Sequence, residues 1–250
     1  MMDLELDGKV AIVTGASRGL GRAMAVALAE QGVSVLAAAR SADDLAELEA
    51  RYPGRIKGRP CDMRDLAAVG ALADEAVAAF GRLDLVVNNA GIAPAGAFLD
   101  QAESVWHEVF TVNVAAPATL ARAAGRHMIP QRSGKIINIA STSGILGKPI
   151  LVAYSSSKGA LLQFTKALAA EWASKGVQVN AIAPGAFETS AQKAVLESPE
   201  ILAMRLKKIP ARRMGVDEEI GPMVCYLASP KSNFVTGAVL VIDGGESSKL

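Results

Sequence analysis

Residues 10–32 read VAIVTGASRGLGRAMAVALAEQG, and this stretch decides the fold. Its first five residues are apolar and strand-like, glycines stand at positions 15, 19 and 21, and an amphipathic helical pattern begins at once. A strand that enters a helix through such a turn brings backbone N–H groups close to a ligand phosphate. Gly15 would allow the tight turn, Gly19 the close approach, and Gly21 the packing of helix on strand. The GxxxGxG spacing departs from the commoner GxGxxG, so the prediction depends on the position of the motif at the first strand–helix junction.

Strand-like and helical patterns alternate along the rest of the chain. Predicted strands cover Lys9–Thr14, Val33–Ala38, Ile56–Pro60, Leu83–Val87, Lys135–Ala140, Val177–Ile182 and Val239–Ile242. Predicted helices cover Gly21–Gln31, Asp43–Arg51, Leu66–Phe80, Ser104–Met128, Tyr154–Ser174 and Glu218–Ala228. The strand segments are continuously apolar, which is typical of parallel strands buried on both faces. The sequence therefore predicts an α/β fold, a single doubly wound Rossmann domain over residues 1–250 with a seven-stranded parallel sheet and helices on both faces.

Composition argues against several classes of function. The formal net charge of the 250 residues is +1 and the basic residues are spread along the chain, which gives no footprint for nucleic acid or an anionic membrane. No apolar run reaches the roughly 18 residues of a membrane span, and the acidic N-terminus lacks a signal pattern. Cys61 and Cys225 stand alone and indicate reduced core thiols in a cytoplasmic protein. With only His107 and His127, neither a metal site nor a histidine-based triad is expected.

Two arginines flank the predicted phosphate site. A helix N-terminus carries positive partial charge, so Arg18 is favourable there only if an anion comes to meet it. The second strand ends in Ala39-Arg40-Ser41 and lacks the acid, about 20 residues beyond the glycines, that binds an adenosine ribose 2′-hydroxyl. Arg40 could grip a 2′-phosphate through paired hydrogen bonds, with Arg18 converging on it, which favours NADP(H) over NAD(H). The alternative makes both arginines solvated surface residues and Ser41 simply a helix N-cap.

A possible proton-transfer pair lies further along the chain. Tyr154 and Lys158 are four residues apart at the start of a predicted helix, so their side chains share one face. A phenol with a pKa of about 10 is a poor acid–base catalyst near neutral pH. A nearby ammonium favours the phenolate and lowers that pKa, so the pair could prepare a tyrosine for proton transfer. Thirteen residues earlier, Ser141 follows a strand at the sheet edge where open α/β domains bind ligands.

With these residues in place, the chain resembles the short-chain dehydrogenase/reductase family over its whole length. The motifs that carry the resemblance are TGASRGLG (14–21), CDM (61–63), NNAG (88–91), Asn113, Ser141, YSSSK (154–158), PGAFET (184–189) and VTGAVLVIDGG (235–245). Several ordered motifs at family spacing are a specific signal, whereas each alone is weak. Among known groups, the chain resembles 3-oxoacyl-carrier-protein reductases and gluconate 5-dehydrogenases.

The resemblance implies a role for each catalytic candidate. Tyr154 would be the general acid in carbonyl reduction and the base in the reverse direction. Lys158 would hold the nicotinamide ribose and lower the tyrosine pKa, and Ser141 would bind the substrate oxygen. Asn113 would anchor a water leading to Lys158, although it could also merely satisfy backbone groups in a long helix. The hydride itself belongs to the cofactor.

The same resemblance implies a cofactor site. Asp62 and the Met63 backbone would contact adenine, Asn89 the adenosine ribose region and Thr189 the carboxamide, while Pro184 and Gly185 would border the nicotinamide. Asp62 could alternatively cap a turn. The complete predicted cofactor set is Gly15, Ser17, Arg18, Gly19, Leu20, Gly21, Arg40, Ser41, Asp62, Met63, Asn89, Ala90, Gly91, Tyr154, Lys158, Pro184, Gly185, Phe187 and Thr189.

Two further expectations concern substrate and assembly. Residues 186–213 mix charges, two prolines and weak helical patterns, which suggests a substrate lid. With 143–146 and 92–95, this segment should contact a small carbonyl or alcohol substrate, and its basic residues leave an acidic substrate or carrier protein open. The helix from Tyr154 carries Leu161, Leu162, Phe164, Leu168 and Trp172, more apolar surface than one face needs, and the family resemblance suggests a homotetramer.

The expected function is NADP(H)-dependent interconversion of a ketone or aldehyde and an alcohol. Two alternatives are a dedicated 3-oxoacyl-carrier-protein reductase and a non-catalytic NADP-binding sensor. Such sensors often lose the proton-transfer residues, whereas Asn113, Ser141, Tyr154 and Lys158 are all present here.

Overall fold

A seven-stranded, wholly parallel sheet forms the centre of the computed structural model, which describes residues 3–189 and 192–248. The strand order is β3-β2-β1-β4-β5-β6-β7. The strands are β1 (Val10–Thr14), β2 (Ser34–Ala39), β3 (Ile56–Pro60), β4 (Leu85–Asn88), β5 (Gly134–Ile139), β6 (Val177–Pro184) and β7 (Val239–Ile242). The order reverses between β1 and β4, and such a switch point opens a crevice at the carboxyl ends of the strands. The predicted fold class is confirmed.

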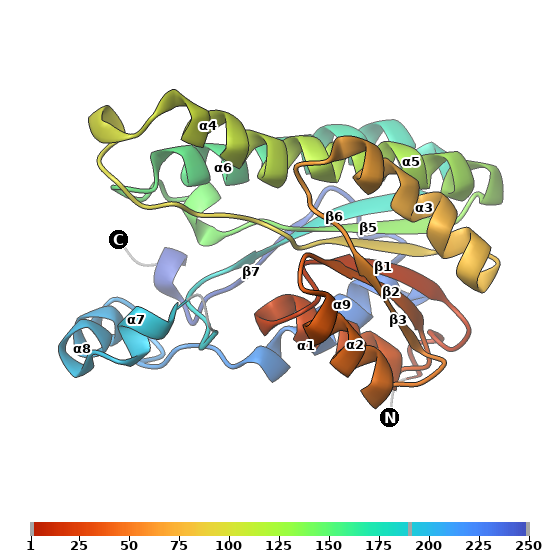
Figure 1. Cartoon of the computed structure of the whole chain (residues 1–250), viewed down its shortest axis with the longest axis horizontal. Coiled ribbons are helices and arrows are strands. Elements are labelled where there is room, and N and C mark those ends of the chain that lie inside the picture. Colours follow the sequence, from red (N-terminus) through yellow and green to blue (C-terminus); the bar gives the residue numbers. More distant parts are fainter. Residues whose placement is uncertain (1–2, 190–191, 249–250) are drawn as a thin grey trace.

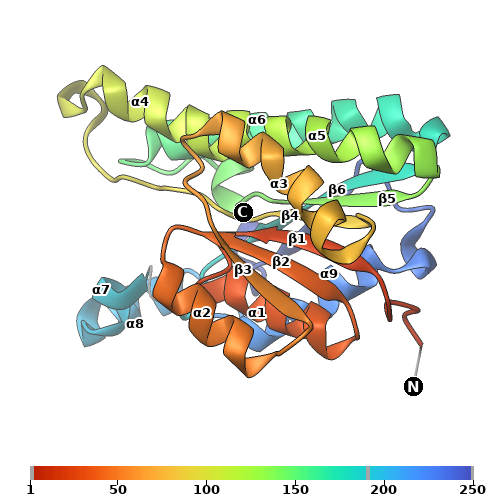
Figure 2. The same ribbon diagram turned by 45° about the vertical axis from the view of Figure 1, so that its right-hand side comes forward.

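Helices cover both faces of the sheet (Figure 1). One layer holds α1 (Gly19–Glu30), α2 (Ala42–Arg51) and α9 (Gly221–Ala228), and the other holds α3 (Leu66–Phe80), α4 (Glu103–Phe110), α5 (Ala116–Gln131) and α6 (Val152–Trp172). Turning the molecule by 45° keeps the sheet between these layers (Figure 2). Two apolar clusters correspond to them: one joins the sheet to α1, α2 and α9, and the other joins it to α3, α5 and α6. Both faces are thus buried, as the apolar strand segments predict.

The edge strands depart from the expected pattern of continuous burial. In β3, Ile56 is buried while Lys57 and Pro60 are exposed, and in β7 Val241 is 41% exposed. An edge strand has a neighbour on one side only, so solvent reaches its outer flank, and charged residues there discourage pairing with another chain. The central strands β1, β4 and β5 are buried along their whole length.

The predicted helix Ser104–Met128 is confirmed in extent, but it is not one regular α-helix. The chain instead forms α4, a π-helical turn over Thr111–Ala115, and then α5. Such turns insert an extra residue into an α-helix and are frequent at functional sites. Pro117, which has no N–H to donate, stands in the first turn of α5. Asn113 lies within the π turn, so the irregularity fixes where its side chain points.

The apolar surface of α6 is largely covered within the chain itself. Leu161, Leu162 and Trp172 are buried, and Phe164 and Leu168 are half-buried against the cluster that includes α5. The indole of Trp172 lies over Gly125 of α5, where an added Cβ would lie 2.5 Å from the ring. The apolar surface of α6 that remains for a partner chain is therefore smaller than the sequence suggests. Large apolar side chains that stay exposed lie elsewhere, at Phe98, Leu99 and Phe234 among others.

Residues after β6 form a separate small layer at the carboxyl end of the sheet. Here α7 (Lys193–Leu196) and α8 (Pro199–Lys207) pack around Ala186, Ile209 and Met214 (Figure 1). A parallel bridge between Phe187 and Gly215 closes the base of this layer. No helix among the described residues is long and apolar enough to cross a membrane.

Candidate active site

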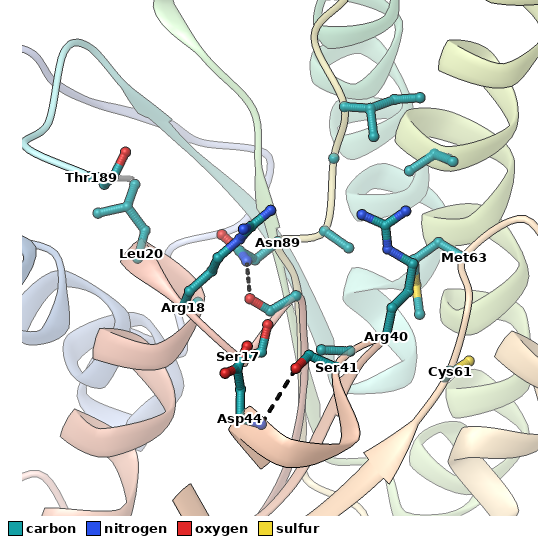
Figure 3. A pocket seen from close by; sticks show the side chains of 18 of the residues that line it. Ser17, Arg18, Leu20, Arg40, Ser41, Asp44, Cys61, Met63, Asn89 and Thr189 are labelled. Atoms are coloured by element: carbon teal, nitrogen blue, oxygen red, sulfur yellow. Dashed lines mark hydrogen bonds between the residues drawn. The ribbon is translucent and has the colours of Figure 1, made fainter. Parts of the chain in front are cut away.

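A cavity of about 750 Å³ opens at the carboxyl ends of the strands, beside the switch point between β1 and β4 (Figure 3). Among the predicted cofactor residues, those that line it are Gly15, Ser17, Arg18, Gly19, Leu20, Gly21, Arg40, Ser41, Asp62, Met63, Asn89, Ala90, Gly91, Gly185, Phe187 and Thr189. They come from five separate segments of the chain. Tyr154, Lys158 and Pro184 do not line this cavity.

The glycine turn is shaped by close backbone approach. Gly15 has a φ of 67° and Gly19 a φ of 52°, values in the left-handed region that glycine adopts at low cost. At Gly21 an added Cβ would lie 2.1 Å from the carbonyl oxygen of Gly15, so α1 can pack against the turn only with glycine there. The role predicted for Gly21 therefore has a geometric basis. This cradle and the helix start above it fit the pyrophosphate of a dinucleotide.

Asn89 clamps the glycine turn to the end of β4. Its side-chain amide donates to the carbonyl oxygen of Thr14 at 2.9 Å and to that of Gly15 at 3.3 Å. In return, the Thr14 hydroxyl accepts hydrogen bonds from the backbone N–H groups of Asn89 and Ala90 at 3.0 and 3.1 Å. The amide nitrogen is occupied in this way, so the main contribution of Asn89 to the site is to hold the turn in place.

Arg18 and Arg40 reach into the cavity from two different elements (Figure 3). Arg18 is the N-cap residue of α1, without a side-chain cap, and Arg40 follows the last residue of β2. Both are exposed, and among the described residues neither guanidinium makes a hydrogen bond or ion pair. By contrast, the neighbouring Arg22 is paired with Glu47 at 2.6 Å. The two predicted phosphate ligands thus keep their donors free to meet an anion.

Ser41 and Asp44 form the floor beneath Arg40. The Ser41 hydroxyl accepts a hydrogen bond from the Asp44 backbone N–H at 3.4 Å, so it caps α2 as well as lining the cavity. Asp44, which lies at the start of the predicted helix Asp43–Arg51, also lines the cavity. Its position three residues after the Ser41 N-cap is the sequence signal by which Asp44 could have been identified.

Asp62 is already held by another residue. The Arg64 guanidinium donates to both oxygens of the Asp62 carboxyl, at distances from 2.5 to 3.0 Å, and also reaches Glu108 of α4 at 3.4 Å. Hydrogen bonding to Arg64 lowers the pKa of Asp62 to about 2. All three side chains line the cavity, and sequence reasoning missed Arg64 and Glu108. Their link across 44 residues leaves no local pattern that could have revealed it.

The catalytic candidates form a buried network behind the cavity. Asn113 is fully buried: its Oδ1 accepts from the Ile92 N–H at 2.9 Å, and its Nδ2 donates to the Ile92 carbonyl and to Ser157 Oγ, each at 3.0 Å. Ser157 Oγ in turn donates to the carbonyl oxygen of Tyr154 at 2.7 Å. The π turn is thereby connected to the first turn of α6. Ser157 is a further residue that sequence reasoning left unassigned.

Lys158 carries a buried ammonium one turn below Tyr154. Its side chain donates to the carbonyl oxygen of Ile139, the last residue of β5, at 2.8 Å, and the nitrogen lies 5.7 Å from the centroid of the Tyr154 ring. Removal from water disfavours the charged form and lowers the pKa of Lys158 to about 8. The spacing of four residues places the two groups on one face, as predicted.

Burial raises the pKa of Tyr154, while the nearby Ser141 side chain acts in the opposite direction. The Tyr154 pKa is therefore raised, whereas the sequence predicts that Lys158 lowers it. The physical reason is that burial removes water from the phenolate, and this effect exceeds the favourable influence of Ser141.

Gly91 joins the network to the cavity. It lines the cavity wall, and an added Cβ there would lie 3.2 Å from Asn113 Oδ1 and 3.4 Å from Lys158 Nζ. These two buried groups therefore lie directly behind the cavity wall at Gly91. Gly91 thus links the cavity to the buried Asn113 and Lys158 side chains.

Comparison with known proteins agrees with this geometry. A family model described as enoyl-(acyl carrier protein) reductase matches residues 15–247. A 2-dehydro-3-deoxy-D-gluconate 5-dehydrogenase of Pseudoalteromonas atlantica is 39% identical over 245 residues, which cover 96% of each chain. The chain belongs to the short-chain dehydrogenase/reductase family. It is accordingly an oxidoreductase of the class that interconverts carbonyls and alcohols with a nicotinamide dinucleotide.

Other members of this family extend the comparison. The 3-oxoacyl-(acyl-carrier-protein) reductase of Vibrio cholerae is 37% identical over 97% of this chain and 98% of its own. A gluconate 5-dehydrogenase of Burkholderia cenocepacia, solved with NADP and tartrate, superposes with a TM-score of 0.94 at 35% identity, covering 99% of this chain and 98% of its own. In this short-chain dehydrogenase/reductase, no cluster of histidine, cysteine and carboxylate side chains within residues 3–189 and 192–248 could hold a metal ion.

Proposed function

We propose that this short-chain dehydrogenase/reductase uses NADP(H) to interconvert a ketone or aldehyde and the corresponding alcohol, with Tyr154 as general acid and base. The observation that carries the proposal is the grouping of Tyr154 with the Lys158 ammonium, which lies 5.7 Å from the centroid of its ring, and with the nearby Ser141 side chain, next to Gly91 of the cavity wall. When bound, the nicotinamide cofactor supplies or accepts the hydride. Everything else in the reaction falls to side chains of this chain.

Tyr154 and Ser141 handle the substrate oxygen. In reduction, the Tyr154 hydroxyl transfers its proton to that oxygen while the Ser141 hydroxyl donates a hydrogen bond to it, which stabilises the developing negative charge. The phenol is protonated at neutral pH, as the acid role requires, although its raised pKa makes it a weaker acid than a solvated phenol. In oxidation the same phenol must first lose its proton.

Lys158 and Asn113 serve the proton path. With a pKa of about 8, Lys158 can exchange a proton near neutral pH and so recharge Tyr154. Its ammonium would also hold the nicotinamide ribose. Asn113, fixed by Ile92 and Ser157, is the anchor for a water on the way to Lys158.

The remaining cofactor contacts follow the wall of the cavity. Arg18 and Arg40, with their donors free, would bind the 2′-phosphate of NADP, while Asp62 and Met63, which line the same cavity, would border the adenine. Three similar structures of the family contain NADP. Gly185, Phe187 and Thr189, together with Pro184 before them, would border the nicotinamide.

Two proposals complete this function. Residues 186–213, which carry α7 and α8, would act as a lid over the substrate of one reductase domain spanning the chain. A homotetramer fits the exposed apolar side chains near the edge strand β7, where Phe234 is fully exposed and Val241 partly so.

The test is consumption of reduced nicotinamide against a panel of carbonyl compounds, with NADPH and NADH in parallel. We expect turnover with NADPH preferred, and a loss of about 10³-fold in kcat for Tyr154→Phe with NADPH affinity unchanged. Tyr52→Phe, far from the cavity, is the control. Tight NADPH binding without tyrosine-dependent turnover would refute the proposal and favour the sensor.

A further inference from the structure

A second, smaller cavity lies at the end of the sheet opposite the cofactor cavity. It has a volume of about 70 Å³, and Lys9, Asp84 and Lys135 are among the residues that line it. Lys9 directly precedes β1, Asp84 directly precedes β4, and Lys135 is the second residue of β5. Because these strands are parallel, the three residues meet at the amino ends of the strands. The small cavity shares no lining residue with the cofactor cavity.

Lys135 brings a buried ammonium to this cavity. The residue is 7% exposed, and its Nζ donates to Asn233 Oδ1 at 2.7 Å and to Ser232 Oγ at 3.3 Å. Asn233 also lines the cavity, so the ammonium is held at the cavity wall. An ammonium has three N–H donors, and the third meets no acceptor among the described residues. Both acceptors are neutral, so they supply hydrogen bonds to Lys135 but no countercharge.

The carboxylate that lines the same cavity is occupied by other donors. Asp84 accepts hydrogen bonds from Arg82 Nε and Nη2, each at 2.7 Å. The Val10 N–H at 3.0 Å and Lys9 Nζ at 3.4 Å are its other side-chain partners. Within residues 3–189 and 192–248, no ion pair joins Asp84 to Lys135. Two cations therefore already share this carboxylate, and the charge of Lys135 is left without a counterion.

A buried cation without a counterion is unfavourable. Burial lowers the pKa of Lys135 to about 8. A water molecule could accept the third hydrogen bond, but only an anion would also balance the charge. A water molecule takes about 30 Å³ in the liquid, so a cavity of about 70 Å³ has room for a halide ion and none for a nucleotide or a sugar acid.

We infer that Lys135, with Lys9 and Asn233 around the same cavity, binds a small inorganic anion of the size of chloride. The site is separate from the proposed reaction. Its lining residues come from β5, from the turn that follows α9 and from the segment before β1, so a bound anion would hold these three parts together. An anion that binds the folded chain and not the unfolded one raises the free energy of unfolding.

The test follows thermal unfolding while chloride replaces a larger anion. The organic sulfonate HEPES is too large for the cavity, and it keeps the ionic strength constant as chloride rises to about 100 mM. Lys135→Met removes the ammonium. Asn233→Asp keeps the shape of the side chain and places a permanent carboxylate beside Lys135. Lys57→Met, an exposed lysine on the edge strand β3, is the matched control for loss of one charge.

We expect chloride to raise the Tm of the wild type by about 4 °C, with saturation. Lys135→Met should lose this rise, and Lys57→Met should keep it. Asn233→Asp should also lose it and should unfold about 4 °C above the wild type when chloride is absent, because its carboxylate takes the place of the anion. This second variant keeps the test decisive if Lys135→Met does not fold.

Diffraction from crystals grown in bromide locates the ion directly. Bromide scatters anomalously, and its peak should lie within hydrogen-bond distance of Lys135 Nζ. A full chloride response in Asn233→Asp or in folded Lys135→Met would overturn the anion site. Bromide found only elsewhere on the molecule would overturn it as well, and would leave water as the third partner of the ammonium.

Discussion

The two halves of the site are built in opposite ways. In the cofactor cavity, the Arg18 and Arg40 side chains are exposed and make no hydrogen bond or ion pair with the described residues. Behind it, Asn113 and Lys158 are 0% and 3% exposed, and their side chains are hydrogen-bonded to the chain. Exposed donors can be exchanged without disturbing packing, whereas buried ones are coupled to the stability of the fold. Cofactor choice should therefore be easy to change, and catalysis should not.

The largest expected effect is that of Lys158→Met. Removing the ammonium should lower kcat by about 10³-fold, because Tyr154 loses its proton partner. The same change should raise the free energy of unfolding at pH 7 by about 2 kcal/mol, because a buried charge with a depressed pKa is destabilising, less the lost bond to Ile139. Kinetics and chemical denaturation would measure both. Lys57→Met should change neither.

The pH dependence of that stability difference follows from the direction of the pKa shift. The pKa of Lys158 is 10.5 when unfolded and about 8 when folded. Between these values the unfolded chain holds a proton that the folded protein has released, so this group makes the folded state more stable as pH rises. Below pH 8, Lys158 is charged in the folded protein and its full destabilising effect is present. The advantage of Lys158→Met should therefore shrink from pH 8 toward pH 10, and a constant advantage would contradict a buried charge as its source.

Arg40→Asp should have the next largest effect, on cofactor choice alone. The substitution replaces a free donor with a carboxylate that repels a 2′-phosphate and can bind a ribose hydroxyl. We expect the ratio of NADPH to NADH affinity to change by roughly 100-fold, which corresponds to about 2.7 kcal/mol. Fluorescence titration of both cofactors would measure it, with unfolding unchanged.

Arg51→Asp is the matched control for that charge reversal, since Arg51 is exposed at the end of α2 and does not line the cavity. It should leave the ratio of affinities unchanged. A similar change in both variants would mean that long-range charge, and not contact with the 2′-phosphate, sets the preference.

Ser157→Ala tests the buried network more gently. The loss of its hydroxyl removes one of the two acceptors of Asn113 Nδ2 and the link to the Tyr154 carbonyl. We expect kcat to fall about 10-fold, and the free energy of unfolding to fall by about 1 kcal/mol, without a change in NADPH affinity. Ser156→Ala, the exposed neighbour, is the control. An unaltered kcat would show that Asn113 needs no support from α6.

The sequence predicted these two halves with different success. The glycine turn, Arg40 and the Tyr154–Lys158 pair follow from local spacing, because a strand–turn–helix junction and a four-residue helical repeat are read within a few residues. The bonds from Asn113 to Ser157 and from Arg64 to Glu108 span 44 residues each, and they depend on how α4 and α6 pack. No local pattern encodes them.

Other departures have the same origin in tertiary structure. The predicted helix over 104–128 had the right extent, but the π turn at Asn113 arises where this segment meets Ile92 and α6. The direction of the Tyr154 pKa was misjudged because sequence spacing gives the distance to a charge and says nothing about burial. The sequence suggested that Trp172 contacts a partner chain, but its indole lies against Gly125 of α5 in the same chain.

The smallest effect expected is that of Asp44→Asn, and it bears most directly on the contrast between the two halves. The Asp44 carboxyl lines the cavity beside Arg40 and would weaken binding of a 2′-phosphate by repulsion across a solvent-filled space. We expect NADPH affinity to rise about 3-fold at low salt, with NADH affinity unchanged and the gain lost at high salt. Asp43→Asn, an exposed acid in the same first turn of α2 but outside the cavity, should have no such effect. If Asp44→Asn instead lowered the affinity for both cofactors and destabilised the fold, this part of the cavity would be built like the catalytic network, with its polar groups needed to hold the structure.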